Sequence, residues 1–448
     1  MGESSVIYKK LAVAFLVAFG VFAAAFMLFS PMQSLLLGVI AFLVTLWTNV
    51  GLSLGVVSLL PIILFPSFSI LSVSQTTQNY ANPIIFLFLG GFLLAIGVEK
   101  TKLHEWIAQK MFSFFPATPR GIIFSLVITS GLLSSLLSNT TTTLLLISIA
   151  LYLTQNPKLK MRFALSIAYG ASIGGILTPI GTPPNLILLG FMQEKGMELF
   201  SFMEWSWMML PLVFAMFFVA AFLLSIGVDG VAIKVENESK KLTKEQKKVL
   251  LLIGGAVLLL LLNAPFKPYW NGLGWSETVI LLGFGLLLFV PPFHTLDWMD
   301  DKAKIPFRIM FLFGAGFSIA SAFSATGLAD SVASYLVALI ELEPILILLA
   351  VAVLVTFTTE ITSNTALVSV MLPIIYALSQ QCGLDAKLFM TVATVCASYA
   401  FMLPIATPPN AIAMSSGTLK VSDMAKYGFV LNIAGILLVV FMAEFFWK

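Results

Sequence analysis

Charged side chains are scarce in this sequence, because Asp, Glu, Lys and Arg together make up only 10% of its 448 residues. Hydrophobic residues make up 59%, a share that soluble globular domains of this length do not reach. Apolar runs of about 20 residues, the length with which a helix crosses a ~30 Å hydrocarbon core, recur from Leu11 to Phe446. The composition predicts an all-α polytopic membrane protein that forms one domain over residues 1–448.

Cysteine and histidine are equally rare, with two of each. Cys382 and Cys396 stand apart in apolar surroundings, and His104 and His294 have no partner at metal-ligand spacing. These spacings do not support a disulfide framework, a transition-metal site or haem attachment. No nucleophile with a neighbouring base is visible either, so we expect that the protein is not an enzyme.

Eleven apolar runs are interpreted as membrane spans. They lie near residues 9–29, 33–48, 49–65, 82–98, 162–193, 206–228, 249–263, 276–293, 306–323, 386–416 and 427–446. Two further apolar stretches, 121–157 and 344–381, each have a polar cluster at the middle, and neither half is long enough to cross the bilayer. We therefore expect two re-entrant hairpins with tips near mid-membrane, at Ser138-Asn139-Thr140 and Ser363-Asn364-Thr365.

The basic residues favour one orientation in the inner membrane. With a cytoplasmic N-terminus, all but four of the 24 Lys and Arg residues fall in inner loops, as the positive-inside rule requires. Because eleven spans are an odd number, the C-terminus is then expected on the periplasmic or extracellular side. Residues 229–248, which are rich in lysine, are predicted to be a cytoplasmic linker, and residues 100–115 an amphipathic helix on the inner surface.

An internal repeat relates the two halves of the chain. Ser138 aligns with Ser363, and at the same offset the motif Pro-Ile-Gly-Thr-Pro-Pro-Asn that ends at Asn185 recurs as Pro-Ile-Ala-Thr-Pro-Pro-Asn ending at Asn410. Five expected spans separate the hairpins, and an odd number reverses the orientation. The repeat cores, 80–228 and 306–446, are therefore predicted to be inverted, a pattern typical of secondary transporters.

Each Pro-Pro-Asn motif lies inside a long apolar run, 162–193 or 386–416, and consecutive prolines must break the helix there. The breaks free carbonyl oxygens near Gly181 and Ala406 for a hard cation, and they leave helix N-termini that favour carboxylates. Neither the tips nor the breaks contain Lys, Arg or His. We therefore expect co-bound cations, rather than a basic side chain, to balance a bound anion.

Glu360 is the only acidic residue near either tip. The favoured interpretation is a structural hydrogen-bond acceptor. A proton site and an indirect support for a bound cation remain as alternatives.

Three features suggest a family: the paired Ser-Asn-Thr tips, the stretch TTEITSNTALVSVMLPI and the stretch SIGGILTPIGTPPNLI. Together they resemble the divalent anion/sodium symporter (DASS) family from about residue 80 to residue 416. The resemblance implies a homodimeric elevator-type transporter that carries C4-dicarboxylates such as succinate, malate or fumarate, with Na⁺ as the coupling ion. Its expected partners are the dicarboxylate or a similar divalent anion, membrane lipid and a second copy of the chain, and no nucleic acid.

The resemblance also implies the site residues. Those expected to contact substrate are Ser138, Asn139, Thr140, Ser363, Asn364, Thr365, Thr182 and Thr407. One sodium ion is expected at Ser134, Ser138, Asn139 and Gly181, and a second at Thr359, Thr362, Asn364 and Ala406.

The sequence departs from the family pattern after both tips. The first tip continues as Thr140-Thr141-Thr142-Thr143 and the second as Thr365-Ala366-Leu367-Val368, where Thr-Ala-Thr is expected in a dicarboxylate carrier, and Pro179 replaces a larger aliphatic residue. Substrate identity therefore stays open between dicarboxylates, sulfate or another oxyanion, and so does sodium-independent exchange. A proton/cation antiporter is disfavoured, because neither Thr-Pro-Pro-Asn segment contains an acid.

Overall fold

The structure, a computed structural model, describes residues 2–48, 52–228, 241–265, 268–335 and 342–447. Within these ranges the chain is helical and contains no β-sheet. Along the first half the helices are α1 (Gly2–Ala25), α2 (Pro31–Thr48), α3 (Leu54–Val57), α4 (Pro61–Ser67), α5 (Val73–Asn79), α6 (Pro83–Lys100), α7 (Leu103–Phe112), α8 (Pro119–Ser134), α9 (Asn139–Tyr152), α10 (Pro157–Gly174), α11 (Pro183–Glu194) and α12 (Phe202–Ser225).

Along the second half the elements are α13 (Lys244–Asn263), α14 (Glu277–Leu287), α15 (Trp298–Asp301), the 3-10 turn η1 (Lys302–Lys304), α16 (Phe307–Thr326), α17 (Leu328–Tyr335), α18 (Pro344–Thr359), α19 (Asn364–Cys382), α20 (Ala386–Ala397), α21 (Pro408–Ser415) and α22 (Val421–Phe445). Many of these helices begin at proline, whose fixed φ suits the first turn and whose missing amide hydrogen costs nothing there.

Seven of the described helical segments are long and apolar enough to cross a membrane. They are α1, α2, α5 with α6, α12, α16, α19 and α22. Six of them match predicted spans, and α19 is the second arm of a predicted hairpin. The polytopic all-helical fold is therefore confirmed.

The predicted span 49–65 is wrong as a single helix. Positions 49–51 lie outside the described residues, and the rest of the run forms α3 and α4. Pro61 begins α4, because proline has no amide hydrogen to continue a preceding helix. Two segments expected as loops between spans are also partly helical, since α5 and α17 form there.

The structure describes the predicted surface helix but only the last part of the predicted linker. Most of the predicted linker, positions 229–240, lies outside the described residues, and its last part already belongs to α13, which begins after a capping box between Thr243 and Gln246. The expected amphipathic helix is α7, whose Leu103, Ala108 and Phe112 are buried against the core.

Both predicted hairpins are present. The α8/α9 pair turns at residues 135–138 and the α18/α19 pair at residues 360–363, so the hairpins keep the offset seen between Ser138 and Ser363. Both long apolar runs with prolines are interrupted as well, between α10 and α11 and between α20 and α21.

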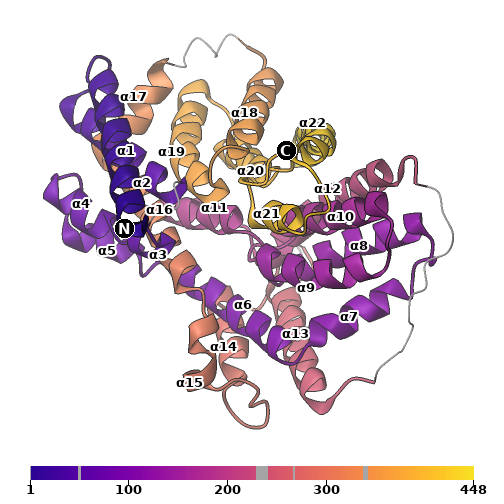
Figure 1. Ribbon diagram of the computed structural model, residues 1–448. Coiled ribbons are helices and arrows are strands. Elements are labelled where there is room, and N and C mark those ends of the chain that lie inside the picture. Colours follow the sequence, from indigo (N-terminus) through magenta and orange to yellow (C-terminus); the bar gives the residue numbers. More distant parts are fainter. Residues whose placement is uncertain (1, 49–51, 229–240, 266–267, 336–341, 448) are drawn as a thin grey trace.

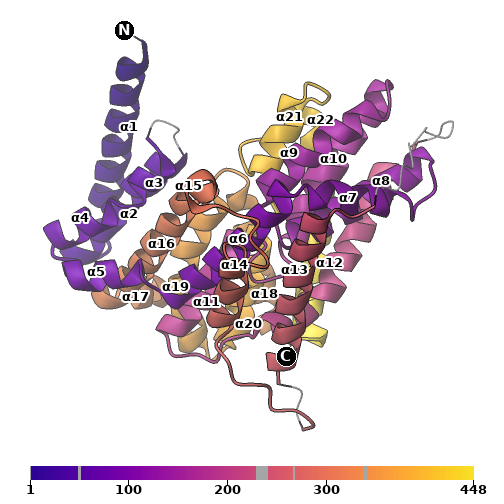
Figure 2. The same ribbon diagram turned by 90° about the horizontal axis from the view of Figure 1, so that it is seen from below.

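The repeats are interwoven at the centre of the molecule. Helix α10 packs on its own hairpin, α8/α9, and α20 packs on α18/α19, but α21 also contacts α9 and α10, and α11 contacts α19 and α20. Figure 1 shows the two hairpins on different sides of these broken helices. The N-terminal helices lie apart from this centre, and α1, which packs on α2, protrudes at one edge (Figure 2). The second half of each broken helix therefore reaches the opposite hairpin.

Candidate functional site

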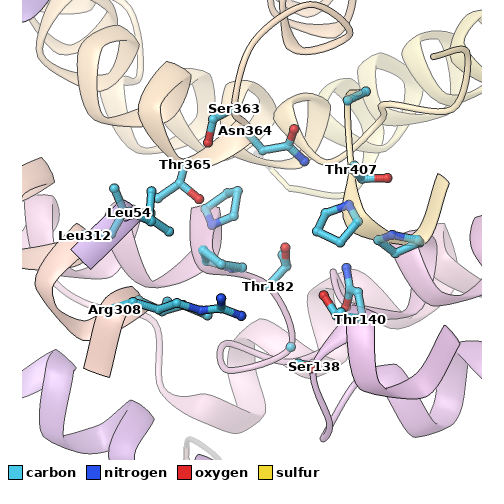
Figure 3. Close-up of a pocket in the computed structure, with 18 of the residues that line it drawn as sticks. Leu54, Ser138, Thr140, Thr182, Arg308, Leu312, Ser363, Asn364, Thr365 and Thr407 are labelled. Carbon is cyan, nitrogen blue, oxygen red and sulfur yellow. The ribbon is translucent and has the colours of Figure 1, made fainter. Parts of the chain in front are cut away.

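A cavity of about 510 Å³ lies where both hairpin tips and both proline breaks meet. Its volume falls in the range typical of small-molecule sites. The opposite wall comes from α2, α3, α6 and α16, with Trp47, Leu54, Phe88, Phe92 and Leu312 as its larger apolar side chains. Figure 3 shows the polar residues of the two tips on opposite sides of this space.

Most of the site residues predicted from the sequence line this cavity. Its lining includes all of the expected substrate contacts and six of the eight expected sodium ligands, three of which are also expected substrate contacts: Ser138, Asn139, Thr140, Thr182, Ser363, Asn364, Thr365, Thr407, Gly181, Thr362 and Ala406. The two exceptions are Ser134 and Thr359, which are fully buried behind the tips. Both of them contact a tip asparagine.

Four helices begin at this cavity: α9 at Asn139, α11 at Pro183, α19 at Asn364 and α21 at Pro408. The first turn of a helix carries unpaired amide groups and a partial positive charge, so these ends attract anions. Ser363, which precedes α19, makes no side-chain cap bond. Its hydroxyl is therefore not used by its own helix.

The first tip holds a cluster of oxygen atoms. Ser134 Oγ donates to Asn139 Oδ1 at 2.5 Å. Gly175, in the break after α10, lies against the same atom, since a Cβ on Gly175 would stand 2.9 Å from Asn139 Oδ1 and 3.1 Å from the Gly181 carbonyl oxygen. Thr178 in the same break donates a short hydrogen bond to the Ser135 carbonyl. The break and the tip thus bring neutral oxygens together around a glycine.

The second tip repeats this arrangement. Thr359 Oγ1 lies 2.8 Å from Asn364 Oδ1 and 2.8 Å from the Ala397 carbonyl oxygen at the end of α20. No group of three or more His, Cys, Asp or Glu side chains gathers anywhere in the described part of the chain. Hydroxyl, amide and carbonyl oxygens without a carboxylate suit a hard cation of low charge.

Glu360 holds the second break in place, as the favoured interpretation of the sequence predicted. Its carboxylate accepts hydrogen bonds from the backbone amides of Phe401, Met402 and Leu403 at 2.8, 2.9 and 3.0 Å. It also accepts one from Asn432 Nδ2 of α22 at 2.7 Å. The unwound segment between α20 and α21 is therefore anchored from the hairpin side and from α22.

The cavity also contains one basic side chain that the sequence did not predict there. The tips and breaks do lack basic residues, but Arg308, in the first turn of α16, lines the cavity from the opposite wall. Figure 3 shows its guanidinium reaching towards Thr182 and the first tip. The sequence pattern placed Arg308 at the start of the predicted span 306–323 and gave it no role in the site, because only the packing of α16 against α3 brings it to this space. The cavity lining therefore includes a fixed positive charge.

Comparison with known proteins finds related transporters. A family model described as citrate transporter matches residues 39–396. A protein of Staphylococcus saprophyticus named sodium-dependent dicarboxylate transporter SdcS is 31% identical over 443 residues, which cover 91% of this chain and 85% of that protein. The protein of the same name from Staphylococcus aureus strain USA300 has the same identity and the same coverage.

A solved structure has a similar fold. The YdaH transporter of Alcanivorax borkumensis, described as having an unusual topology, superposes with a TM-score of 0.58 over 83% of this chain and 87% of its own. The two sequences are only 16% identical, so this likeness concerns the fold alone.

Proposed function

We propose that this chain, which belongs to the citrate transporter family, carries C4-dicarboxylates of the succinate, malate and fumarate class across the cell membrane together with sodium ions. The observation that carries the proposal is the meeting of both Ser-Asn-Thr tips and both Thr-Pro-Pro-Asn breaks in one cavity. Two tips on opposite sides of one cavity offer one set of donors to each end of a short dianion. The relatives named as sodium-dependent dicarboxylate transporters support this choice.

In the proposed site the eight predicted contact residues bind the two carboxylates. Thr140 and Thr365 follow their tip asparagines in the first turns of α9 and α19, where backbone amides and the helix dipole also favour an anion. The threonines before the proline pairs, Thr182 and Thr407, complete the lining between the tips.

The two oxygen clusters are proposed as the sodium sites. The first uses Ser134, Ser138, Asn139 and the Gly181 carbonyl, and the second uses Thr359, Thr362, Asn364 and the Ala406 carbonyl. Support comes from the hydroxyl-to-amide contacts inside both clusters. In each cluster the tip asparagine would serve two ligands, with its side-chain oxygen on sodium and its first-turn position close to the anion. Sodium binding would then organise the tip for the anion, which is a physical basis for coupling.

We further propose an elevator mechanism in a homodimer, with the N-terminus in the cytoplasm and the C-terminus outside. The repeat cores, 80–228 and 306–446, share one plan of hairpin and broken helix, which supports an exchange of equivalent conformations. In this scheme the tips and breaks move together past the wall formed by α2, α3, α6 and α16.

Exchange of dicarboxylates without sodium is the second candidate. Arg308 favours it, because a fixed guanidinium in the cavity supplies counter-charge that sodium would otherwise provide. Counterflow of labelled succinate against unlabelled succinate in sodium-free medium would detect it.

The test is uptake of radiolabelled succinate by proteoliposomes that contain the purified chain. Unlabelled malate and fumarate should compete, and sulfate should not. Asn139→Ala and Asn364→Ala should each remove uptake while the protein still inserts, because each removes an amide that is proposed to serve both sodium and substrate. Competition by sulfate but not by malate would replace the dicarboxylate assignment with an inorganic oxyanion.

A further inference from the structure

Arg308 is the one charged residue among the described residues that line the cavity. It is the second residue of α16, and its backbone lies against α3, where a Cβ on Gly55 would stand 3.4 Å from the Arg308 Cα. The base of the Arg308 side chain therefore lies at the contact between α16 and α3. Neighbouring Ile309 and Leu312 line the same wall.

The guanidinium has no protein partner within the described part of the chain. Among the residues that the structure describes, no carboxylate forms an ion pair with Arg308, and its side chain is exposed towards the cavity. By contrast, Arg162 donates to the Leu224 carbonyl at 2.7 Å and lies over the Tyr427 ring. A permanently charged, planar donor in a cavity whose described lining contains no acidic residue is suited to a carboxylate, which it binds through two parallel hydrogen bonds.

The direction of the side chain selects one end of the anion. Figure 3 shows Arg308 reaching the side of the cavity that holds Thr182, Ser138 and Thr140, while Ser363, Asn364 and Thr365 lie on the other side. A dianion spanning the cavity presents one carboxylate to the second tip and the other to the space between the first tip and Arg308.

We propose that Arg308 binds the carboxylate at the first tip and thereby makes the protein select dianions over monoanions of the same shape. This inference rests on the proposed function, since it concerns the same substrate. The inference adds Arg308, on the wall opposite the tips, to the proposed substrate contacts as a residue that determines specificity. When only one carboxylate is present, the second tip can satisfy it and the guanidinium is left without its ligand. The preference for dianions therefore depends on the charge of the substrate group that lies between the first tip and Arg308.

The experiment compares succinate with succinamate, its monoamide, as inhibitors of labelled succinate uptake by proteoliposomes of the full chain. For variants with too little uptake to measure inhibition, the affinity for each compound is measured instead by calorimetry on the purified protein in detergent. In the unaltered protein succinate should bind much more tightly. Arg308→Gln should weaken succinate binding by about 10- to 100-fold, the range for a lost hydrogen bond to a charged group, and should change succinamate binding little. Arg308→Lys keeps the charge and loses the planar guanidinium, so its affinity for succinate should lie between those of the unaltered protein and of Arg308→Gln.

Lys158→Gln is the matched control, because it removes one positive charge from an exposed position in the first turn of α10, away from the cavity. It should leave both affinities unchanged. Equal weakening of the two compounds by Arg308→Gln, or no weakening of either, would overturn the inference while leaving dicarboxylate transport standing. An unaltered protein that binds neither compound would overturn the proposed function together with this inference.

Discussion

Asn185 and Asn410 make the same pair of hydrogen bonds in the two repeats. Asn185 Nδ2 donates to the carbonyl oxygens of Gly175 and Thr178 at 3.2 and 2.9 Å. Asn410 Nδ2 donates to those of Ala400 and Leu403 at 2.8 and 3.0 Å. Each asparagine ends its Pro-Pro-Asn motif and satisfies carbonyls that the helix break has freed, so the motif both breaks the helix and stabilises the break.

Replacing either of these asparagines by alanine should therefore destabilise the break next to it. Asn410→Ala leaves the buried Ala400 carbonyl oxygen without its donor, at a cost of about 1–3 kcal/mol, and removes one of the two donors to the partly buried Leu403 carbonyl. We expect a lower thermal unfolding temperature in detergent and loss of transport, and the same for Asn185→Ala. Gln109→Ala, which removes an exposed amide on α7, is the control and should change neither. Wild-type unfolding temperatures in both asparagine variants would contradict this role.

Gly175 offers a direct test of the proposed first sodium site. A methyl group there would stand 2.9 Å from Asn139 Oδ1 and 3.1 Å from the Gly181 carbonyl oxygen, inside the proposed ligand cluster. Gly175→Ala should therefore raise the sodium concentration for half-maximal uptake by about tenfold or more, equivalent to about 1.4 kcal/mol. Gly254→Ala on α13 is the matched control, because a Cβ there meets no atom within 4 Å. An unchanged sodium dependence in Gly175→Ala would place the first sodium ion elsewhere.

Glu360 should be sensitive to loss of one acceptor oxygen. In Glu360→Gln an amide NH₂ replaces an oxygen that accepts from backbone N–H groups, so a donor faces a donor and the segment from Phe401 to Leu403 loses part of its anchor. We expect destabilisation by about 1–3 kcal/mol and a large fall in uptake. Glu343→Gln, at an exposed position before α18, should behave like the wild type.

The alternative role for Glu360, as a proton site, gives a different result. In that case Glu360→Gln would fold with normal stability and uptake would lose its dependence on pH. Uptake measured across pH 5.5–8.5, together with thermal unfolding, separates the two roles.

The two hairpins and the two helix breaks could be predicted from the sequence, because polar triplets and paired prolines inside long apolar runs do not fit an unbroken membrane helix. Their duplication at one offset predicted an inverted repeat, and the family resemblance implied that both tips contact one substrate. The span 49–65 was wrong because an apolar run does not show that Pro61 begins a separate helix. Arg308 was missed because its position in the cavity depends on how α16 packs against α3, which local sequence does not encode. The hydrogen bonds of Asn185 and Asn410 likewise depend on the path of the chain through each break.

Alternating access predicts side-dependent labelling of the cavity. Ile361 and Ile405 belong to the tip and break of the second repeat, line the cavity and are 65% and 76% exposed. In a background of Cys382→Ser and Cys396→Ala, single cysteines at these positions should react with an impermeant maleimide from one side in sodium alone. Dicarboxylate should slow this reaction and allow reaction from the other side during turnover. Labelling from one side only under all conditions would contradict movement of the tips.

Asp301 joins the end of α6 to the segment before α16, outside the membrane spans. It is buried, and it contacts Lys100 Nζ at 2.6 Å and Lys304 Nζ at 3.0 Å. Burial alone would raise its pKa, but the hydrogen bonds from Lys100, the Asp297 amide and Lys304 outweigh burial and lower the pKa to about 2. The charged form is therefore stabilised in the folded protein.

A lowered pKa contributes stability above the ordinary carboxyl value near 4, and this contribution is lost as the pH falls towards 2. Asp301→Asn should cost about 1–2 kcal/mol at pH 7, after allowance for solvent screening of the partly exposed lysines. The difference from the wild type should shrink between pH 4 and pH 2. Asp300→Asn, at an exposed neighbouring position, should show no such difference. Equal stability of wild type and Asp301→Asn at pH 7 would show that these ion pairs do not stabilise the fold.

The central claim is that the cavity between the two tips binds a dicarboxylate together with sodium. The most direct test is accumulation of radiolabelled succinate by proteoliposomes under an inward sodium gradient, compared with an equal choline gradient. We predict accumulation above the external concentration with sodium, none with choline, and none with sodium in Asn139→Ala or Asn364→Ala. Equal accumulation in sodium and choline, or full accumulation in either asparagine variant, would contradict the account.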